Sequence, residues 1–302
     1  MRGGALPEKI TVGVDVGGTK THIAVVEGGT RRDVLVPSAD WRRGRLFEDP
    51  GNLTRLVELI TTTVPGPYRI ALGLHDLDTE EQRAVAVDEL TRRLPGSVRV
   101  VNDAELLGPA AGLDECLKLI VGTGAIALGT DAAGTLLTAD GHGSLLGDTG
   151  SASALVRETV RAGLRLADSD RPATALADPA VALLCDVYRV ADTAELAVAV
   201  SADDPYQWGR HAPLIFDALG RGSAVAAAVL DEAADVLARN LAALRRRGAR
   251  GDTVVGAGGV LTAQTELQSR LTARLSVHAP DLTLRILTAP PVEGALVLAD
   301  RL

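Results

Sequence analysis

The sequence has 302 residues, enough for one or two domains with a sizeable buried core. Hydrophobic residues make up 46% of it but aromatic residues only 2%, so the core must be built from Ala, Val and Leu, and ligand stacking on a ring is a poor first expectation. The formal net charge is −8 and the basic residues come in small groups, which argues against nucleic acid as a partner.

Cysteine spacing and hydropathy indicate the compartment. Cys116 and Cys185 fall in no metal-binding or redox spacing, which favours a reducing environment. The polar start of the chain does not read as a secretory signal, and no apolar run approaches the ~18 residues that a spanning helix needs. We therefore expect a cytoplasmic protein with no membrane partner.

The first half of the chain predicts three leading strands followed by alternating helices and strands. Alternating or continuous apolar runs indicate the strands, and i, i+3, i+4 spacing of Leu, Val and Ile indicates the helices. The predicted elements are strands Ile10–Val16, His22–Val26 and Asp33–Val36, a helix capped by Asn52, strand Arg69–Leu74, a helix from the capping box Thr79–Gln82 to Leu94 with Val87 on its apolar face, strand Val98–Val101 and a helix from Ala104.

The second half repeats this order with one long addition. Its predicted elements are strands Leu117–Val121, Ala125–Thr130 and Gly134–Thr138, a helical region over 151–247, strand Asp252–Ala257, a helix over Ala263–Val277, strand Thr283–Leu287 and a closing helix from Val292. An internal duplication of this kind predicts two α/β lobes with a cleft between them. We place the lobes at 1–113 and 114–302, with the final helix free to pack back on the N-terminal lobe.

Each predicted lobe has a glycine-rich turn between its first two strands. In "DVGGTK" the backbone amides of Gly17, Gly18 and Thr19 could face a nucleotide phosphate, with Lys20 nearby, because glycine lets an anion approach the backbone closely. The segment is not a Walker A loop, because that motif is followed by a helix and here a strand follows. The alternative to a phosphate-binding loop is a plain hairpin turn. The matching turn Gly122–Gly124 in the second half favours a phosphate cradle.

Two carboxylates stand at strand ends, where they could do chemistry. Asp15 ends a hydrophobic strand, so it should be paired, hydrated or near a metal such as Mg²⁺ bound through water; otherwise it caps its own turn. Asp103 follows another strand and could accept a proton from a substrate hydroxyl that Asn102 orients. The alternative there is a helix N-cap, and local sequence does not separate the two.

Two further glycine-rich segments are weak signals when taken alone. The segment "GHGSLLGDTGSAS" carries Asp148 before a helix, although the segment alone favours a plain glycine-rich linker. In "VVGAGGVL" a strand ends in small residues that would admit a flat nucleoside against the backbone.

Taken together in this order, "GVDVGGTKTHIAVV", "VNDA", "IVGTGAIALG", "GHGSLLGDTGS", "VVGAGGV" and "PPVEGALVLA" resemble the BadF/BadG/BcrA/BcrD family of the sugar kinase/Hsp70/actin superfamily, nearest its N-acetylglucosamine kinase-like branch. The resemblance spans residues 10 to 300. It implies a duplicated ribonuclease H-like fold with ATP in the cleft, and an ATP- and Mg²⁺-dependent kinase acting on an amino sugar such as N-acetylglucosamine.

The resemblance also assigns roles to single residues. It implies Asp103 as the catalytic base and a sugar-side position for Asp148, and it places Asp15, which we expect to hold Mg²⁺ through water, in the first phosphate motif. The implied binding residues are Gly17, Gly18, Thr19, Lys20, Gly122, Thr123 and Gly124 for the phosphates, Gly258, Gly259 and Val260 for adenosine, and Asn102, Gly147, Asp148 and Thr149 for the sugar.

The chain departs from the family pattern on the substrate side. Ala125 and Ile126 follow the second phosphate turn where the animal enzymes often have Ser and Asn, and Thr149 replaces a common Glu in "GDTGS". His75 and Asp76 give "GLHD" where "GLAG" is frequent. The acceptor is therefore less secure than phosphorylation itself, and another hexose or a cyclitol is an alternative.

Two other functions fit the same superfamily. An activator of radical dehydratases would need cysteines for an iron–sulfur cluster, and neither cysteine has that context. A sugar or nucleotide sensor without phosphotransfer is the third reading, disfavoured by the aspartates. A small-molecule substrate and a homodimer are the partners we expect.

Overall fold

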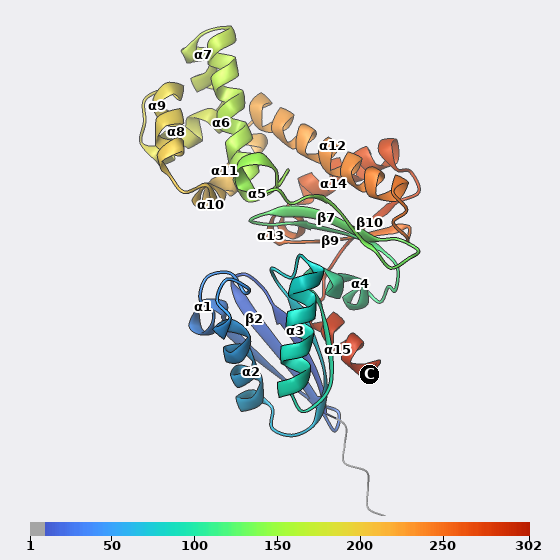
Figure 1. The fold of residues 1–302 in the computed structure, drawn as a ribbon. Helices are drawn as coiled ribbons and strands as arrows, with labels where there is room; N and C mark the ends of the chain where they lie inside the picture. The colour runs from blue at the N-terminus through green and yellow to red at the C-terminus, as the bar shows by residue number, and fades with distance from the viewer. Residues whose placement is uncertain (1–9) are drawn as a thin grey trace, which may run out of the picture. The chain divides into compact units, whose positions relative to one another are not determined.

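The computed structural model describes residues 10–302 and divides into two compact units. Unit 1 comprises the chain up to Asp114 together with Leu287–Leu302, and unit 2 comprises Glu115–Ile286. The boundary expected after residue 113 lies one residue away from the observed one. The closing segment belongs to unit 1 (Figure 1), so the N-terminal unit is assembled from two separate stretches of chain.

Unit 1 is built on a five-stranded sheet in the order β3-β2-β1-β4-β5. The strand β1 runs antiparallel to β2 and parallel to β4, which is parallel to β5. Its strands are β1 (Ile10–Val16), β2 (Lys20–Glu27), β3 (Thr30–Pro37), β4 (Tyr68–Leu74) and β5 (Gly96–Asn102). Its helical elements are α1 (Ser38–Trp41), α2 (Gly51–Thr63), α3 (Glu80–Arg93), the 3₁₀ turn η1 (Asp103–Leu106), α4 (Leu107–Ala110) and α15 (Val292–Asp300).

The two faces of this sheet are covered differently because side chains alternate along a strand. Val12, Val14 and Val16 join the apolar cluster that contains the buried residues of α2 and α3. Gly13 faces the other way, where a Cβ would lie 2.8 Å from the Leu296 nitrogen of α15. Figure 1 shows α15 on the face of the sheet opposite α2 and α3. Asp15 shares the α15 face at the carboxyl end of β1.

Unit 2 repeats the plan of unit 1. Its sheet has the order β10-β9-β6-β7-β8, which read backwards is the strand order of unit 1. The strands are β6 (Leu117–Val121), β7 (Ala125–Thr130), β8 (Leu136–Asp140), β9 (Thr253–Ala257) and β10 (Thr283–Ile286). As in unit 1, the central strand is antiparallel to its hairpin partner and parallel to the later strand β9. This confirms the predicted duplicated ribonuclease H-like fold.

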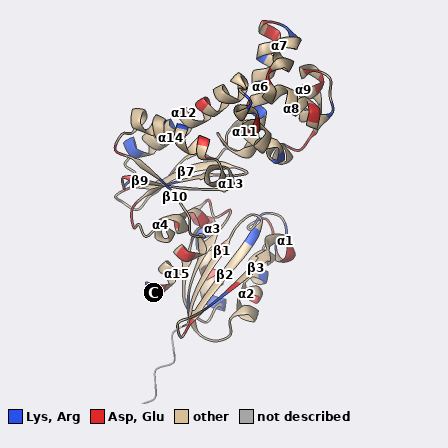
Figure 2. Ribbon diagram, turned by 180° about the vertical axis from the view of Figure 1, so that it is seen from behind, with Lys and Arg blue, Asp and Glu red and all other residues tan. Residues whose placement is uncertain are grey.

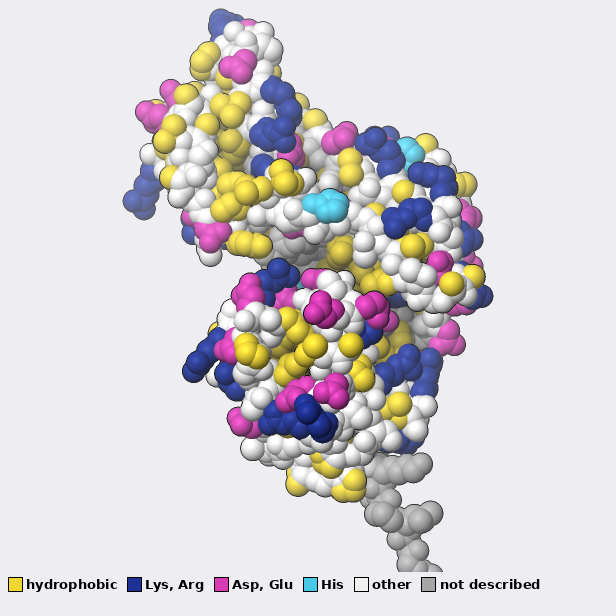
Figure 3. Space-filling model, in the orientation of Figure 1, with side chains coloured by type: hydrophobic (Ala, Val, Ile, Leu, Met, Phe, Trp, Pro, Cys, Tyr) yellow, Lys and Arg dark blue, Asp and Glu magenta, His cyan; other side chains and the backbone are white. Residues whose placement is uncertain are grey.

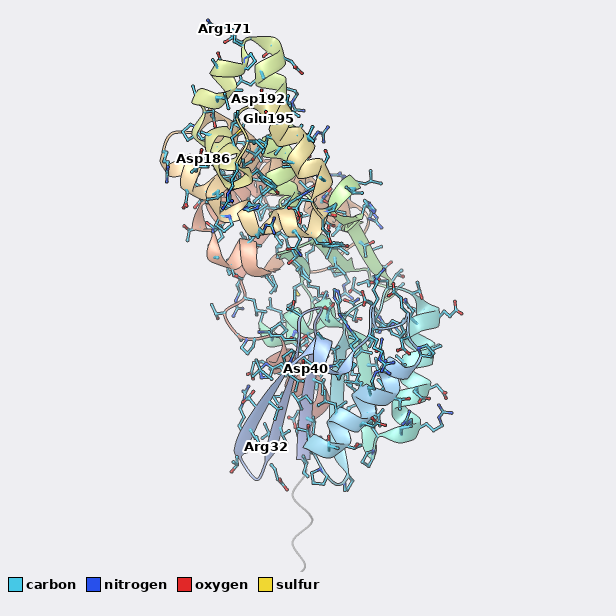
Figure 4. All side chains as sticks on the ribbon, turned by 90° about the vertical axis from the view of Figure 1, so that its left-hand side faces the viewer. Arg32, Asp40, Arg171, Asp186, Asp192 and Glu195 are labelled. Atoms are coloured by element: carbon cyan, nitrogen blue, oxygen red, sulfur yellow. The ribbon has the colours of Figure 1, made fainter. Side chains whose placement is uncertain are left out.

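The predicted helical insertion of unit 2 is a set of short helices between two long ones. The helices of the unit are α5 (Gly143–Leu146), α6 (Ala152–Ser169), α7 (Pro172–Ala177), α8 (Pro179–Tyr188), α9 (Thr193–Ala202), α10 (Pro205–Trp208), the 3₁₀ turn η2 (Gly209–His211), α11 (Ala212–Gly220), α12 (Ala224–Arg246), α13 (Gly259–Ala263) and α14 (Thr265–His278). The apolar stripe of α12, which includes Leu230, Leu237 and Leu241, is buried in the core of this unit. Figure 4 labels the acidic residues Asp186, Asp192 and Glu195 on or beside α8 and α9.

Three local expectations are wrong. Asn52 does not cap α2: it lies inside the helix, and its amide group donates to the carbonyl oxygens of the preceding loop. Val87 is 41% exposed, so the buried stripe of α3 is carried by Ala86 and Leu90 instead. The segment after β5 begins as a 3₁₀ turn at Asp103 rather than as a helix at Ala104. The capping box Thr79–Gln82 is confirmed.

Charged residues lie in small groups, and the apolar helices are short or interrupted by charged residues. Basic and acidic positions alternate in small groups along the ribbon in Figure 2 and on the face shown in Figure 3. Over residues 10–302, no single helix has the length and apolar character to cross a bilayer; the bent pair Pro205–Gly220 and Ala224–Arg246 meets that test only when its two helices are taken together.

Candidate active site

The turn between β1 and β2 presents free backbone amides. The N–H of Gly17 donates to the Lys20 carbonyl at 3.0 Å, and Ser38 donates to the carbonyls of Gly17 and Thr19, both at 2.9 Å. Among the described residues, the N–H groups of Gly18 and Thr19 have no acceptor. These two amides, together with the nearby Lys20, fit an anion such as a phosphate.

The corresponding turn of unit 2 has the same arrangement. The N–H of Gly122 donates to the Gly124 carbonyl at 2.8 Å, and the Gly122 carbonyl accepts from Ala152 at 2.8 Å. Within residues 10–302, the N–H groups of Thr123 and Gly124 have no acceptor either. The duplication therefore extends from strand order to the hydrogen-bonding state of the two turns.

In unit 2 the predicted phosphate turn lies next to the predicted adenosine segment. A Cβ on Gly258, whose φ is +93°, would lie 2.5 Å from the carbonyl carbon of Val121, and a Cβ on Gly122 would lie 3.4 Å from the Gly259 nitrogen. A side chain on Gly259 itself would meet nothing within 4 Å. The close packing requires glycine at 258, whereas Gly259 leaves open space, with the half-buried Val260 beside it.

The side chain of Asp15 is half-buried at the end of β1. Burial raises its pKa to about 7, and the negative charge of Asp103 acts in the same direction, while Lys20 and His75 lower it. Asp15 and Asp103 are therefore close enough to interact electrostatically in unit 1. A cation beside them would offset the cost of burying the Asp15 carboxylate and the repulsion between the two negative charges.

The structure assigns the N-cap of η1 to Asn102 and not to Asp103. Asn102 is the N-cap: its Oδ1 accepts from Ala104 at 2.9 Å, its backbone N–H donates to Glu105, and its amide group donates to the Leu77 carbonyl. Asp103 is the first residue of the turn, with Oδ1 held by the Ala104 N–H at 2.8 Å. Its Oδ2 lies 3.1 Å from Nδ1 of His75. The carboxylate is thus not needed as a cap.

Asp148 lies in a loop that is folded around two carboxylates. Asp140 accepts from the backbone N–H groups of Asp148 and Thr149 at 2.8 and 2.9 Å. Asp148 is buried with φ +57°, and its Oδ1 accepts from Gly143 at 3.2 Å. Burial raises the pKa of Asp148, and the bonds from backbone amides oppose that shift. A Cβ on Gly147 would lie 2.6 Å from Asp140 Oδ1, so glycine is required there.

A cavity of about 300 Å³ lies beside this loop, between α6 and α12. Its lining includes Thr149, Arg157 and Glu232. Arg157 donates to the carbonyls of Ser144 and Gly147, so it holds the loop from the helix side. Of the predicted sugar residues, only Thr149 lines this cavity.

Several residues of the site were missed by the sequence analysis. Arg42 donates to the Gly18 carbonyl at 2.9 Å, and its Nη1 is buried with no hydrogen-bond partner among the described residues. In the sequence it was only part of a small basic group, "WRRGR". Asp140 and Arg157 gave no signal, because their contacts join positions that no local motif links.

No metal centre is preformed in the described part of the chain: no group of three or more His, Cys, Asp or Glu side chains there is arranged to hold an ion. Mg²⁺ usually takes one or two carboxylates and completes its shell with water and phosphate oxygens. A single carboxylate such as that of Asp15 is compatible with that mode.

Comparison with known proteins relates the fold to sugar kinases. The chain is 24% identical to the N-acetyl-D-glucosamine kinase of Dictyostelium discoideum over 97% of its own length and 98% of the relative's. A proposed N-acetylglucosamine kinase from Chromobacterium violaceum superposes with a TM-score of 0.66 at 21% identity, covering 97% of this chain and all of that one. A ROK family glucokinase from Streptomyces griseus, solved with glucose and AMPPNP, gives 0.51 at 17% identity over 97% and 98% of the two chains.

These matches show the fold of the sugar kinases and actin-like ATPases. No family model matches the chain, so the finer resemblance to the BadF/BadG/BcrA/BcrD family is not confirmed. The residue roles implied by that resemblance stay predictions.

Proposed function

We propose that this protein is an ATP- and Mg²⁺-dependent kinase that transfers the γ-phosphoryl group of ATP to a hydroxyl of N-acetylglucosamine or a related amino sugar. The observation that carries the proposal is the pair of matched turns, each with two backbone N–H groups free to bind phosphate oxygens. Similarity to an N-acetyl-D-glucosamine kinase over nearly the whole chain supports the amino sugar as acceptor.

The nucleotide fits the residues that are present. The amides of Gly18 and Thr19 in unit 1, and of Thr123 and Gly124 in unit 2, would bind phosphate oxygens, and the open space at Gly259 would admit the nucleoside. Asp15 would hold Mg²⁺ through water. Bound MgATP supplies the phosphoryl group, and its Mg²⁺ ion would neutralise part of the negative charge of the phosphates.

Asp103 would act as the base. As the acceptor oxygen bonds to the γ-phosphorus, the hydroxyl proton passes to the Asp103 carboxylate and the bond to the ADP oxygen breaks, with ADP as leaving group. The side chain suits this task because Asn102, not Asp103, makes the capping bond. In unit 1 the buried guanidinium of Arg42, fixed by the Gly18 carbonyl, adds positive charge beside the phosphate turn.

The test is a coupled assay of ADP release with MgATP and N-acetylglucosamine, glucosamine, N-acetylmuramic acid, glucose or a cyclitol, with ³¹P NMR of the product. We expect a sugar phosphate from an N-acetylated amino sugar. ATP consumption that rises with none of these acceptors would contradict the proposal and favour a sensor.

The role of Asp103 is tested by Asp103→Asn, which should lower kcat by about 10²- to 10⁴-fold while ATP affinity is retained. The control is Asp88→Asn, whose side chain is 76% exposed on α3. A correctly folded Asp103→Asn protein with wild-type turnover would show that another group is the base.

The iron–sulfur alternative is disfavoured by the two cysteines. Both are free and buried, and burial raises the pKa of each thiol, which disfavours the thiolate that ligates iron. Iron analysis of the purified protein tests this reading directly.

A further inference from the structure

His75 lies between the candidate base and the first phosphate turn. It follows β4 directly, and its backbone N–H donates to the Val16 carbonyl at 2.9 Å, which fixes it beside the end of β1. Its Nδ1 is 3.1 Å from Oδ2 of Asp103. Its Nε2 lies 3.5 Å from the place that a Cβ on Gly18 would occupy. One imidazole ring therefore contacts the base and packs against the glycine turn.

The carboxylate of Asp76 lies beside the imidazole ring of His75. Its Oδ1 lies 3.6 Å from Nε2 of His75 and 3.0 Å from Nη2 of Arg45, and its Oδ2 accepts from the Leu46 N–H at 3.0 Å. Asp76 is 8% exposed and has a φ of +67°, a conformation that costs a non-glycine residue energy. Arg45 and Leu46 hold this buried carboxylate in place, so the negative charge beside the His75 ring has a fixed position.

Arg42 closes the same network on the side of the phosphate turn. It donates to the Gly18 carbonyl, and its Nη1 lies 3.9 Å from Asp76 Oδ2. The chain of contacts thus runs from Gly18 through Arg42, Asp76 and His75 to Asp103. An alanine and a glycine, which are frequent at 75 and 76 in the family that the sequence resembles, could make none of the side-chain contacts.

We propose that His75 is a positioning residue that holds the Asp103 carboxylate in its working orientation and ties that orientation to the first phosphate turn. This inference rests on the proposed kinase function. The Ala104 N–H fixes Oδ1 of Asp103 and His75 fixes Oδ2, so the carboxylate cannot rotate about its last bond without losing a hydrogen bond. Because misplacement by about 1 Å can cost about 10²-fold in rate, a base held at both oxygens has a kinetic advantage.

The charge state of the ring follows from its neighbours. The hydrogen bond to Asp103 raises the pKa of His75, burial opposes this, and the charges of Asp103 and Asp76 raise it while Arg42 lowers it. Asp15 is the other charged group that couples to the ring. The ring is charged below its raised pKa and loses that charge as the pH rises through it, so the bond to the carboxylate weakens on the alkaline side.

The kinetic test compares His75→Ala with His278→Ala. His278 pairs with Asp235 at 2.7 Å in unit 2, so it is a matched His–Asp contact outside this network. We expect His75→Ala to lower kcat by about 10²-fold with little change in the KM for ATP, and His278→Ala to change neither. Added imidazole should restore part of kcat to His75→Ala but none to Asp103→Asn. The alkaline limb of the kcat/KM profile should move in His75→Asn.

A readout that does not need activity separates this inference from the proposed function. In ¹⁵N NMR titrations the pKa of His75 should fall in Asp103→Asn and stay unchanged in Asp88→Asn. If the wild type phosphorylates no acceptor but this fall occurs, the kinase proposal fails and the contact stands. If the enzyme is active and either His75→Ala has wild-type kcat and pH profile or the pKa does not move, the positioning role is overturned.

Discussion

At the residue scale, the carboxylates of Asp15 and Asp103 differ in how their negative charge is stabilised. Asp103 has a hydrogen-bonded partner at each oxygen, whereas Asp15 is burdened by burial and by the charge of Asp103. A group in the second condition lowers the stability of the folded protein whenever it is ionised. The metal-free protein should therefore show a pH dependence that can be traced to one side chain.

The first residue-scale prediction is that Asp15→Asn stabilises the metal-free protein at high pH. The folded pKa of Asp15 is about 7 and its ordinary value is 3.8, so the folded state binds more protons between these limits. Stability from this group is highest below about pH 4, falls as the pH rises to 7, and stays low above it. In EDTA at pH 8 the variant should have a higher thermal unfolding midpoint than the wild type, and at pH 4 an equal one.

The control for this prediction is Asp40→Asn, because Asp40 is exposed on α1 (Figure 4). It should leave the midpoint within error at both pH values. A wild type and an Asp15→Asn protein with parallel pH profiles would contradict the assignment.

Single residues also show how far sequence reasoning reaches. The turn glycines and Asp103 could be proposed as site residues because their signals are local, a residue type at a fixed place after a strand, and their roles stay predictions. His75 and Arg42 were not assigned roles, because their contacts join chain segments 28 and 24 residues apart. Asn52 was misread as a cap because an Asn at a helix start bonds equally well to a preceding loop.

At the element scale, the proposed phosphate recognition lies in strand-to-strand turns, and the segments next to these turns are closely packed. In unit 2 the end of β6 packs closely against the start of α13, where Gly258 leaves no room for a Cβ and Gly259 leaves open space. The two adjacent glycines therefore have different requirements.

The element-scale prediction uses these two glycines as a matched pair. Gly258→Ala should destabilise the protein by about 1–3 kcal/mol, because the new Cβ would meet the Val121 backbone at a positive φ. Gly259→Ala should leave the unfolding midpoint unchanged but weaken ATP binding in calorimetry, since its methyl group enters the open space. Equal stability losses in both variants would contradict this division.

Most element bounds could be predicted, and the misses have physical causes. The strands β6 and β7 match their predicted ranges because both are largely buried and one glycine turn, Gly122–Gly124, separates them. The strand β3 is longer than expected, since its exposed polar residues Arg31 and Arg32 still pair with β2. Val87 follows the helical period but lies beyond the edge of the sheet-facing stripe, which periodicity alone does not reveal.

At the scale of the whole molecule, each unit has its own apolar core. The face of the unit 1 sheet opposite α2 and α3 is covered by α15, which places Ala295 and Leu298 against Leu106. The sequence predicted both lobes from the repeated order of elements, but the place of the last helix was left open because hydrophobic periodicity does not say which sheet a helix covers.

The whole-molecule prediction is that damage to α15 is felt in unit 1 and not in unit 2. Leu298→Asp puts a charge at a position that is 5% exposed and should cost about 3 kcal/mol or more. Hydrogen exchange should show lost protection in β1 and β4, with α6 and α12 unaffected. Leu302→Asp, at a position that is 43% exposed, is the control. Uniform loss of protection over both units would contradict the separation of the cores.

Because unit 1 is assembled from two separate stretches of chain, the order of synthesis affects the order in which the two units fold. Strands β1 to β5 leave the ribosome before unit 2, yet the helix that covers one face of their sheet lies at Val292–Asp300, after all of unit 2. Domains generally fold as units during synthesis, N-terminal first. Here the continuous unit 2 can complete its core while the earlier sheet still has a bare face. The strands of unit 1 are thus translated before unit 2, but their sheet is covered only after unit 2 has been made.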